Sequence, residues 1–538
     1  MSPKNIQSNL LLLVCIGLMV FLLILPIYAS NPLAASAALP EYINEYSVPT
    51  AASAPLAITV DANGLVWFTE SNASKLAKFD PVTNSFAEYA VPGVGDMWGV
   101  TLDHNGNVWL TQYSGKGSVG PGGSIVFGGN GRLVRFDPTR NNFTSVDVPT
   151  LGSFPMRLVV DDQNRIWFTE LLGNKIGVYD QSKKQLTEYP VPTNASGPAD
   201  LAFDRNGALW FTETYAKNLG EFFPENQSFT EYPLGNSTAS QIVSSPVGLA
   251  VDGQSNVWVA DHGGNWIVEF NPVTHGIVKY PTHFPPEDIY PISLVNDLLI
   301  DSNGKVWFTE HGGNSIGYLN TKDYAMVEFP IPTGPLSTCL WLALAPNGDI
   351  WFTEWSTNKI GVVQSSLSIP VSILVSEKYL TLSPGDETTI SLLTKTSQDI
   401  VGNGTLRSSW SSYTPLDASV SFSSQYPSLA GPTSTSAQAE LFISTTTKPG
   451  NYTLGLGIDT GRVAIWSMVQ VQITAQPSTT PIGTSLTLVS AAIVIFVFVV
   501  LVLGIVLRST RRQRPTSPTS PSSTKRRSVY HSEIPVKP

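Results

Sequence analysis

The sequence predicts an all-β protein: a seven-bladed β-propeller followed by an immunoglobulin-like β-sandwich and one C-terminal transmembrane helix. A unit with β patterning and a central tryptophan recurs seven times, at spacings of 42 to 58 residues, and such a period is typical of propeller blades. The repeat stops near residue 370, where short alternating runs rich in Ser and Thr begin. The seven tryptophans are Trp67, Trp109, Trp167, Trp210, Trp258, Trp307 and Trp351.

Each unit is interpreted as four strands, named A to D from the inside of the ring outward. In the unit at 301–320, a D-x-N-G type turn at Asp301–Gly304 leads into strand B, which ends W-F-T-E at Glu310. Such turns favour hairpins because Asn and Gly tolerate positive φ. Strand C begins with an N-K-I-G pattern, and strand D carries an E-Y-x-V-P pattern or a variant of it.

The order of these patterns predicts how the ring closes. A strand-D pattern at 41–49 precedes the first tryptophan, and no clear one follows Trp351. We therefore expect residues 41–49 to pair outside strand C of the last blade, which leaves no open seam between first and last blade.

The two ends of the chain predict its location. An apolar run in residues 1–37 follows Lys4 and reaches small residues, as in a secretory signal peptide or an uncleaved signal anchor. The uncharged stretch 486–507 is followed by four arginines within seven residues, which predicts a single-pass cell-membrane protein with its C-terminus in the cytoplasm. The predicted segments are the signal (1–37), propeller (38–369), sandwich (370–475), linker (476–485), helix (486–507) and basic tail (508–538).

Net charge limits the kinds of partner expected for the part of the chain that is predicted to lie outside the cell. Lys4 and the tail hold 9 of the 31 basic residues, so the part predicted to lie outside carries a net charge of about −18. This balance argues against nucleic acid as its partner. We expect a small-molecule, peptide or surface-polymer ligand, and membrane attachment through the C-terminal helix.

Four large side chains break the repeat where strand A lines the mouth of the channel. Three blades have a small residue there, Ala57, Gly99 and Gly248, but the other four have Arg157, Asp200, Asp297 and Trp341. Together with Asn296, they form the predicted ligand-binding site, because departures from a repeat often mark function. The alternative is that Arg157 and Asp200 form an ion pair that only plugs the channel.

Strand B ends on the same face, with an acid in nearly every blade. We expect these acids to accept backbone N–H groups in the following turn. Blades 5 and 6 add His262 and His311, which makes Glu310, His311 and His262 the candidate catalytic residues, since imidazole suits proton transfer near neutral pH. The alternative is two exposed polar loop residues. The Gly-rich connection 114–131 belongs to the same face and could cover the channel as a lid.

The unit W-F-T-E-x-x-x-N-K-I-G, repeated with E-Y-x-V-P over about residues 40–365, resembles the streptogramin B lyase (virginiamycin B lyase) family of seven-bladed propellers. The resemblance implies opening of a cyclic depsipeptide by elimination, with a histidine base, glutamates and magnesium. The family's histidines follow a proline at the start of strand A, and this chain has none there. The residues at that position are Leu56, Trp98, Met156, Ala199, Val247, Asn296 and Leu340.

A second pattern, Val295–Leu298, is similar to the strand-A positions that bind a divalent cation in gluconolactonase-like propellers, with Asp200 as a further candidate ligand. Magnesium or calcium is therefore the candidate cofactor. Three functions stay open: a membrane-anchored propeller that binds a ligand without catalysis, a C–O lyase of the virginiamycin B lyase type with a rearranged site, and a cation-dependent lactonase.

Overall fold

The structure is a computed structural model, and all its described residues fall within one compact unit, Met1–Pro481. It describes residues 39–114, 116–119, 125–234, 245–282, 293–334, 337–397, 403–411, 416–429 and 433–475. These residues form strands and one 3-10 turn, η1 (Ser71–Ala73), and contain no α-helix. The all-β prediction is therefore confirmed for them.

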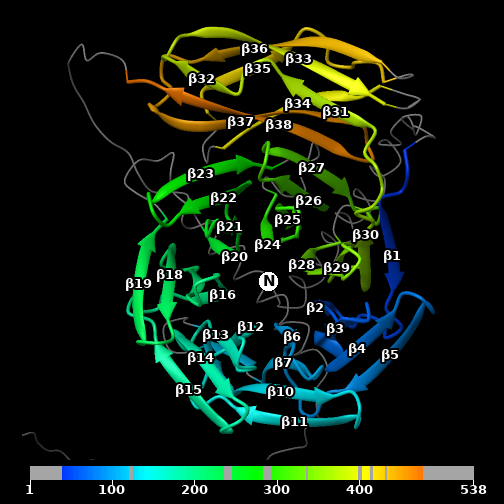
Figure 1. The fold of residues 1–538 in the computed structure, drawn as a ribbon, viewed down its shortest axis with the longest axis vertical. Coiled ribbons are helices and arrows are strands. Elements are labelled where there is room, and N and C mark those ends of the chain that lie inside the picture. The colour runs from blue at the N-terminus through cyan, green and yellow to red at the C-terminus, as the bar shows by residue number, and fades with distance from the viewer. Residues whose placement is uncertain are drawn as a thin grey trace, which may run out of the picture. The chain divides into compact units, whose positions relative to one another are not determined.

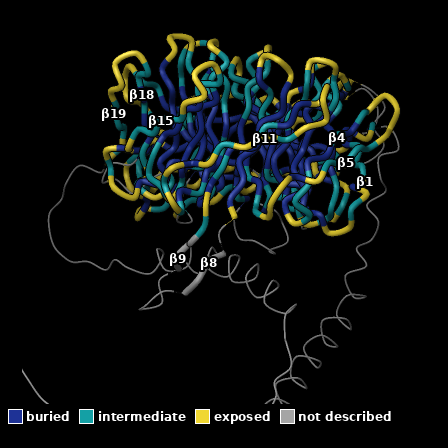
Figure 2. The backbone as a smooth tube through the Cα atoms, turned by 90° about the horizontal axis from the view of Figure 1, so that it is seen from below, coloured by how far each residue is buried: buried dark blue, intermediate teal, exposed yellow. Residues whose placement is uncertain are grey.

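Seven antiparallel four-stranded blades stand around a central axis, each with strand A innermost (Figure 1); six are separate sheets, and the seventh is the β24–β27 part of an eight-stranded sheet. Buried residues fill the middle layer of this ring, and exposed ones mark the turns of both faces (Figure 2). Blades 1 to 3 are β2 (Pro55–Val60), β3 (Val66–Glu70), β4 (Lys75–Asp80), β5 (Ser85–Ala90); β6 (Val100–Leu102), β7 (Val108–Tyr113), β10 (Gly131–Asp137), β11 (Asn142–Asp147); and β12 (Pro155–Val160), β13 (Ile166–Glu170), β14 (Lys175–Asp180), β15 (Gln185–Pro190). Blades 4 to 7 are β16 (Pro198–Phe203), β17 (Leu209–Glu213), β18 (Asn218–Phe223), β19 (Ser228–Pro233); β20 (Pro246–Val251), β21 (Val257–Asp261), β22 (Trp266–Asn271), β23 (Gly276–Pro281); β24 (Val295–Ile300), β25 (Lys305–Glu310), β26 (Ser315–Asn320), β27 (Ala325–Pro330); and β28 (Cys339–Leu344), β29 (Ile350–Glu354), β30 (Lys359–Val363) with β1 (Ile43–Ser47).

The prediction for ring closure is confirmed. Strand β1 pairs antiparallel with β30, in a register that joins Ile43 to Val363 and Ser47 to Lys359. The Asn358 side chain donates to the carbonyl oxygens of Val48 and Thr50 at 3.1 and 2.9 Å, which ties the connection after β1 to the last blade.

The repeated tryptophan is held by the repeated turn. In blade 1 the Asp61 carboxylate accepts the N–H groups of Asn63 and Leu65 and, at 3.2 Å, the indole N–H of Trp67. A buried indole N–H needs such an acceptor, so the spacing of Asp and Trp recurs with the blade. The same bond joins Asp103 to Trp109, Asp161 to Trp167, Asp252 to Trp258 and Asp301 to Trp307.

The threonine of W-F-T-E links neighbouring blades around the channel. The hydroxyl of Thr111 accepts the N–H of Gly99 at 2.8 Å and donates to the Met156 carbonyl of the next blade at 2.8 Å. Thr353 of blade 7 donates to Leu56 of blade 1 in the same way. Blade 5 has Ala260 at this position and lacks the hydroxyl.

We expect Gly99→Ala to lower the free energy of unfolding by about 1–3 kcal/mol, the usual cost of overpacking. A Cβ at residue 99 would lie 2.2 Å from the Met156 carbonyl oxygen, a backbone atom, so the seam between blades 2 and 3 would have to open. Urea unfolding measures the loss. Gly334→Ala is the control, because a Cβ there meets nothing within 4 Å. Equal effects of the two substitutions would contradict the prediction.

The chain after the propeller begins its strands at Val371 and forms two sheets. One has the order β31-β33-β36-β35. In the other sheet, β38 pairs antiparallel with β37 and with β27 of blade 6. It also pairs with β32, and this pairing is parallel. The sequence predicted a separate sandwich and did not reveal that it extends a blade; its immunoglobulin-like character stays a prediction. These strands are β31 (Val371–Val375), β32 (Tyr379–Leu382), β33 (Glu387–Thr396), β34 (Thr405–Trp410), β35 (Ala418–Phe422), β36 (Ser434–Ile443), β37 (Gly450–Asp459) and β38 (Ala464–Ile473).

The predicted signal (1–37), linker (476–485), transmembrane helix (486–507) and tail (508–538) lie outside the described residues. Among the residues that are described, no helix is long and apolar enough to cross a membrane. Within 114–131 the structure describes the antiparallel pair β8 (Lys116–Val119) and β9 (Ile125–Gly128), but residues 115 and 120–124 are not described. The predicted lid therefore stays a prediction.

Candidate functional site

A bulge at the start of strand A aims side chains toward the channel mouth. In blade 3, Pro155 pairs with Glu170 and Leu158 with Phe168, and the register shifts between them. Arg157 lies in this irregular stretch. The same shift recurs in blades 1, 4, 5, 6 and 7, so it belongs to the repeat; in blades 4, 6 and 7 it lies around Asp200, Asp297 and Trp341. Bulges of this kind re-aim side chains and are frequent beside functional sites.

Four of the five predicted binding residues meet. The Arg157 guanidinium donates from Nε to Asp200 at 2.9 Å and from Nη2 to Asp297 at 3.0 Å. Its Cζ lies 4.2 Å from the centre of the Trp341 ring, a cation–π contact. The cluster therefore joins blades 3, 4, 6 and 7 across the channel.

The second oxygen of each aspartate is also engaged. Asp200 accepts the N–H of Leu249 at 2.9 Å, and Asp297 accepts the N–H of Leu342 at 2.8 Å. Both aspartates are buried, whereas the Arg157 side chain is 21% exposed and its Nη1 forms no hydrogen bond within the described residues. Burial raises the pKa of Asp297, and the charge of Arg157 opposes this effect. The ion pair between Arg157 and Asp200 is therefore present, and Nη1 of Arg157 stays without a hydrogen-bond partner among the described residues.

Asn296 does not join this cluster. Its amide nitrogen donates to the carbonyl oxygen of Leu340 at 2.8 Å, and the residue is buried between blades 6 and 7. A guanidinium fills the space between Asp200 and Asp297, so these three residues do not fit the cation site considered from the sequence. Within the described part of the chain, no group of three His, Cys, Asp or Glu side chains could hold a metal ion.

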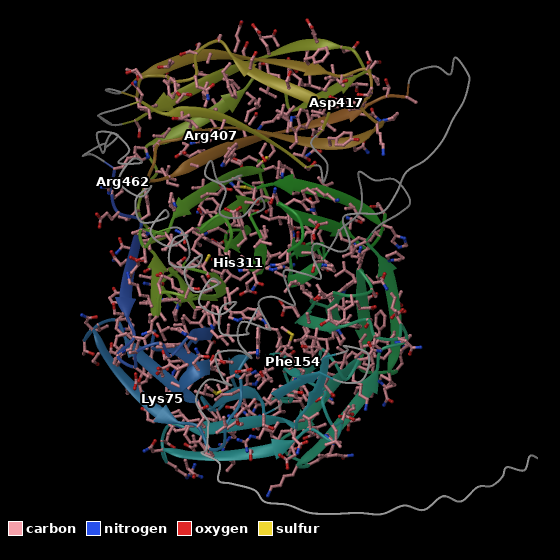
Figure 3. The ribbon with its side chains drawn as sticks, turned by 180° about the vertical axis from the view of Figure 1, so that it is seen from behind. Lys75, Phe154, His311, Arg407, Asp417 and Arg462 are labelled. Carbon is pink, nitrogen blue, oxygen red and sulfur yellow. The ribbon has the colours of Figure 1, made fainter. Side chains whose placement is uncertain are left out.

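The two candidate histidines come together. Their rings lie 4.9 Å apart in a T-shaped arrangement, and both residues are half-buried. Figure 3 labels His311. Burial lowers the pKa of each, and for His311 the neighbouring His262 lowers it further. The Nδ1 of His262 lies 3.3 Å from the Val295 carbonyl oxygen. A carbonyl only accepts, so Nδ1 carries the hydrogen and Nε2 of the neutral ring is left as a base.

The acids at the end of strand B differ from expectation. Glu70, Glu170 and Glu310 are fully buried, and no backbone N–H donates to their carboxyl oxygens in the described residues. The expectation of a turn-capping role is therefore wrong for these three. Asp261 accepts a backbone N–H from Ser245 at 2.9 Å, but this residue precedes strand A and does not belong to the turn after strand B. Glu310 lies below the surface of the mouth, not on it.

An aromatic group that the sequence did not single out joins blades 2 and 3. The ring of Phe154 lies 5.7 Å from Trp98 and 4.8 Å from Tyr113. Exposed apolar side chains occur on the same face in blades 3 and 4, at Leu172 and Tyr215. The signal was present, because aromatic residues stand at or before the start of strand A only in some blades.

The fold and the mouth define a class, the seven-bladed propeller whose blades meet at a polar channel mouth. The model of the virginiamycin B lyase family matches residues 129–378. The chain is similar to the structure of a streptogramin B lyase, with 25% identity and a TM-score of 0.51 over 60% of this chain and 96% of that one. The resemblance predicted from the W-F-T-E repeat is confirmed.

Two further structures show the same fold. Virginiamycin B lyase from Staphylococcus aureus, and its catalytically inactive variant with quinupristin, each share 23% identity with this chain and a TM-score of 0.50, over 60% of this chain and 98% of the lyase. None of the curated proteins matches the sequence.

Proposed function

We propose that this protein is a membrane-anchored surface propeller that binds a ligand at its channel mouth without catalysis. The observation that carries the proposal is Arg157: two carboxylates and an indole hold its guanidinium in place, while Nη1 keeps its hydrogen-bonding capacity. A donor fixed in advance loses little conformational entropy on binding.

The surroundings indicate the chemistry of the ligand. Nη1 of Arg157 would donate to an oxygen atom, and the aromatic group at Trp98 and Phe154 would contact an apolar part. A small molecule, a peptide or a surface polymer can present both features. The acidic balance of the outer part disfavours nucleic acid.

Anchoring is proposed from the sequence of the terminal segments. The uncharged stretch 486–507 and the arginines that follow it support a single span with a cytoplasmic tail, and 1–37 supports export of the rest. This arrangement would hold the propeller outside the cell, where its mouth meets ligands.

A lyase of the virginiamycin B lyase type with a rearranged site is the second candidate. The neutral imidazoles of His262 and His311, 4.9 Å apart, favour it, since an unprotonated ring can accept a proton in an elimination. No step is assigned to a metal, because the described residues do not provide a site for one.

We expect Arg157→Lys to weaken ligand binding at least tenfold, because lysine keeps the charge but loses the planar fork that presents Nη1. Isothermal titration of the full-length chain with quinupristin and with simple lactones, with and without magnesium and calcium, measures binding. Product analysis of the same samples detects ring opening.

Arg165→Lys is the matched control, since Arg165 also pairs with an aspartate, Asp161 at 2.6 Å, and lies over a tryptophan, Trp167, but on the opposite face. Equal affinity of the Arg157→Lys protein would place the site elsewhere. Ring opening that stops in His262→Ala would favour the lyase instead.

A further inference from the structure

Five blades contain two glutamates that meet inside the same blade. The first ends strand B and is fully buried; the second lies on strand D, and strand register puts it on the same face. In blade 1, both carboxyl oxygens of Glu70 are buried and accept no hydrogen bond from the described residues. An ionised carboxylate that is buried without a donor is costly, which favours a protonated Glu70 beside Glu88. The pairs are Glu70–Glu88, Glu170–Glu188, Glu213–Glu231, Glu310–Glu328 and Glu354–Glu45.

In blades 1, 3 and 7 the strand-D glutamate is the ionised member, because its pKa lies below the ordinary value. The Glu88 carboxylate accepts three hydrogen bonds: from the Thr50 N–H at 3.1 Å, from the Thr50 hydroxyl at 2.7 Å and from the Lys75 ammonium at 2.6 Å. Burial acts to raise the pKa of Glu88, but these hydrogen bonds lower it below its ordinary value. Blade 3 repeats the arrangement with Glu188, Thr150 and Lys175.

The strand-B glutamate is the protonated member. Burial first, and then the neighbouring carboxylate, raise the pKa of Glu70 to about 7 and those of Glu170 and Glu213 to about 8. Glu354 also reaches about 8, and the pKa of Glu310 lies well above its ordinary value. Each of these carboxyls also faces other polar or titratable groups. They are Ser53 and Lys75 for Glu70, Ser153 and Lys175 for Glu170, Ser196 and Asn218 for Glu213, Thr357, Lys359 and Cys339 for Glu354, and Thr282, Ser293 and Cys339 for Glu310.

The pairs lie at the seams of the ring. Thr50 belongs to the connection that arrives from blade 7, and it is held by Glu88 of blade 1. The same applies to Thr150 and Thr193, which reach from the preceding blade to Glu188 and Glu231. Loss of the proton from the buried partner would set two negative charges side by side at the seam, where burial makes repulsion costly.

We propose that these five carboxyl–carboxylate pairs make the propeller a pH-sensitive structure, which holds its blades together in acidic surroundings and loosens as the pairs lose their protons. At any pH between the pKa that a strand-B glutamate has in the unfolded chain and its pKa in the folded protein, the glutamate is protonated in the folded protein and ionised in the unfolded chain. The stability they contribute is full below about pH 4.5, falls as the pH rises above that value, and is completely lost once the pH has passed through about 7 to 8. We infer that the outer part of the protein is built for an acidic medium.

Blade 2 provides the uncharged form of the same device. It has Gln112 at the end of strand B, and its Oε1 accepts the guanidinium of Arg132 at 2.7 Å from Nε. An amide at this position is therefore compatible with the fold and does not titrate. A glutamine that replaces the strand-B glutamate of another blade therefore places there the residue type that blade 2 already has.

The test is thermal unfolding of the full-length chain in detergent micelles between pH 4.5 and pH 9. In the wild type, each carboxyl that is protonated only in the folded state should raise the unfolding equilibrium constant about tenfold per pH unit between about pH 5 and 7. The double variant Glu70→Gln, Glu170→Gln should lose less stability over this range. Glu440→Gln, an exposed glutamate, removes a similar charge and should follow the wild type.

A wild-type midpoint that is constant or rises from pH 5 to pH 8 would overturn the proposal, as would a double variant with the same pH profile as the wild type. If the double variant does not fold, infrared spectroscopy of the wild type decides. The carbonyl band of protonated carboxylic acids should be present at pH 6 and absent at pH 9, and its absence at pH 6 would refute the proposal.

Discussion

Asp297→Ala is expected to lower the free energy of unfolding by about 3–5 kcal/mol, the cost of breaking a buried ion pair from one side. Asp297 is 1% exposed and accepts both Arg157, at 3.0 Å, and the N–H of Leu342, at 2.8 Å. Alanine would leave a guanidinium without one partner and a buried N–H without an acceptor. Urea unfolding at pH 7 measures the loss.

Two further variants separate the loss of the charge from the loss of the hydrogen-bond acceptor. Asp297→Asn keeps an oxygen for Leu342 and loses only the charge, so we expect a smaller effect. Asp459→Ala is the control, because its bond to Arg407 is partly exposed and should contribute no more than about 1 kcal/mol. A loss below 1 kcal/mol for Asp297→Ala would show that the cluster does not hold the ring together.

Trp466→Ala is expected to cost about 3–5 kcal/mol, as for other large aromatic side chains removed from a core. Its indole is 2% exposed, packs in one cluster with Trp258, Tyr280 and Phe308 of blades 5 and 6, and donates to Glu328 at 2.9 Å. Removing it would weaken both the pairing of β27 with β38 and the shared core.

The same variant tests whether the propeller and the C-terminal sheets unfold together. We expect the wild type to show one cooperative transition by tryptophan fluorescence and circular dichroism. Tyr426→Ala, at an exposed position, should change stability by less than about 0.5 kcal/mol. Two separate transitions in the wild type would contradict the coupling.

The cluster at the mouth bears on both the stability of the ring and the proposed binding. Residues 140 apart in sequence, Arg157 and Asp297, meet there because their blades face each other across the channel. The contact stabilises the ring and at the same time fixes the donor that the proposed ligand would meet. Stability and binding can therefore be separated only by a variant that keeps the charge, such as Arg157→Lys.

What the sequence by itself determined was the repeat: blade number, strand order, turn chemistry and the closure by 41–49. These features are local, since alternation with period 2, a D-x-N-G turn and an Asp–Trp spacing of six residues act within one hairpin. The mouth residues were found for the same reason, because Arg157 and Asp200 depart from a local pattern. Their face was predictable, and so was the pairing of Arg157 with Asp200; the contacts of Arg157 with Asp297 and Trp341 were not.

Only the tertiary structure decided which side chains meet. Alternation assigns a residue to a face of its sheet but does not identify the neighbour that another blade supplies. It therefore did not predict that Asn296 donates to the Leu340 carbonyl while Asp297 pairs with Arg157. The protonated glutamates were hidden because protonation depends on burial and on a second carboxyl from another strand. The pairing of β27 with β38 was hidden as well, since an edge strand carries no local signal of the partner that will cover it.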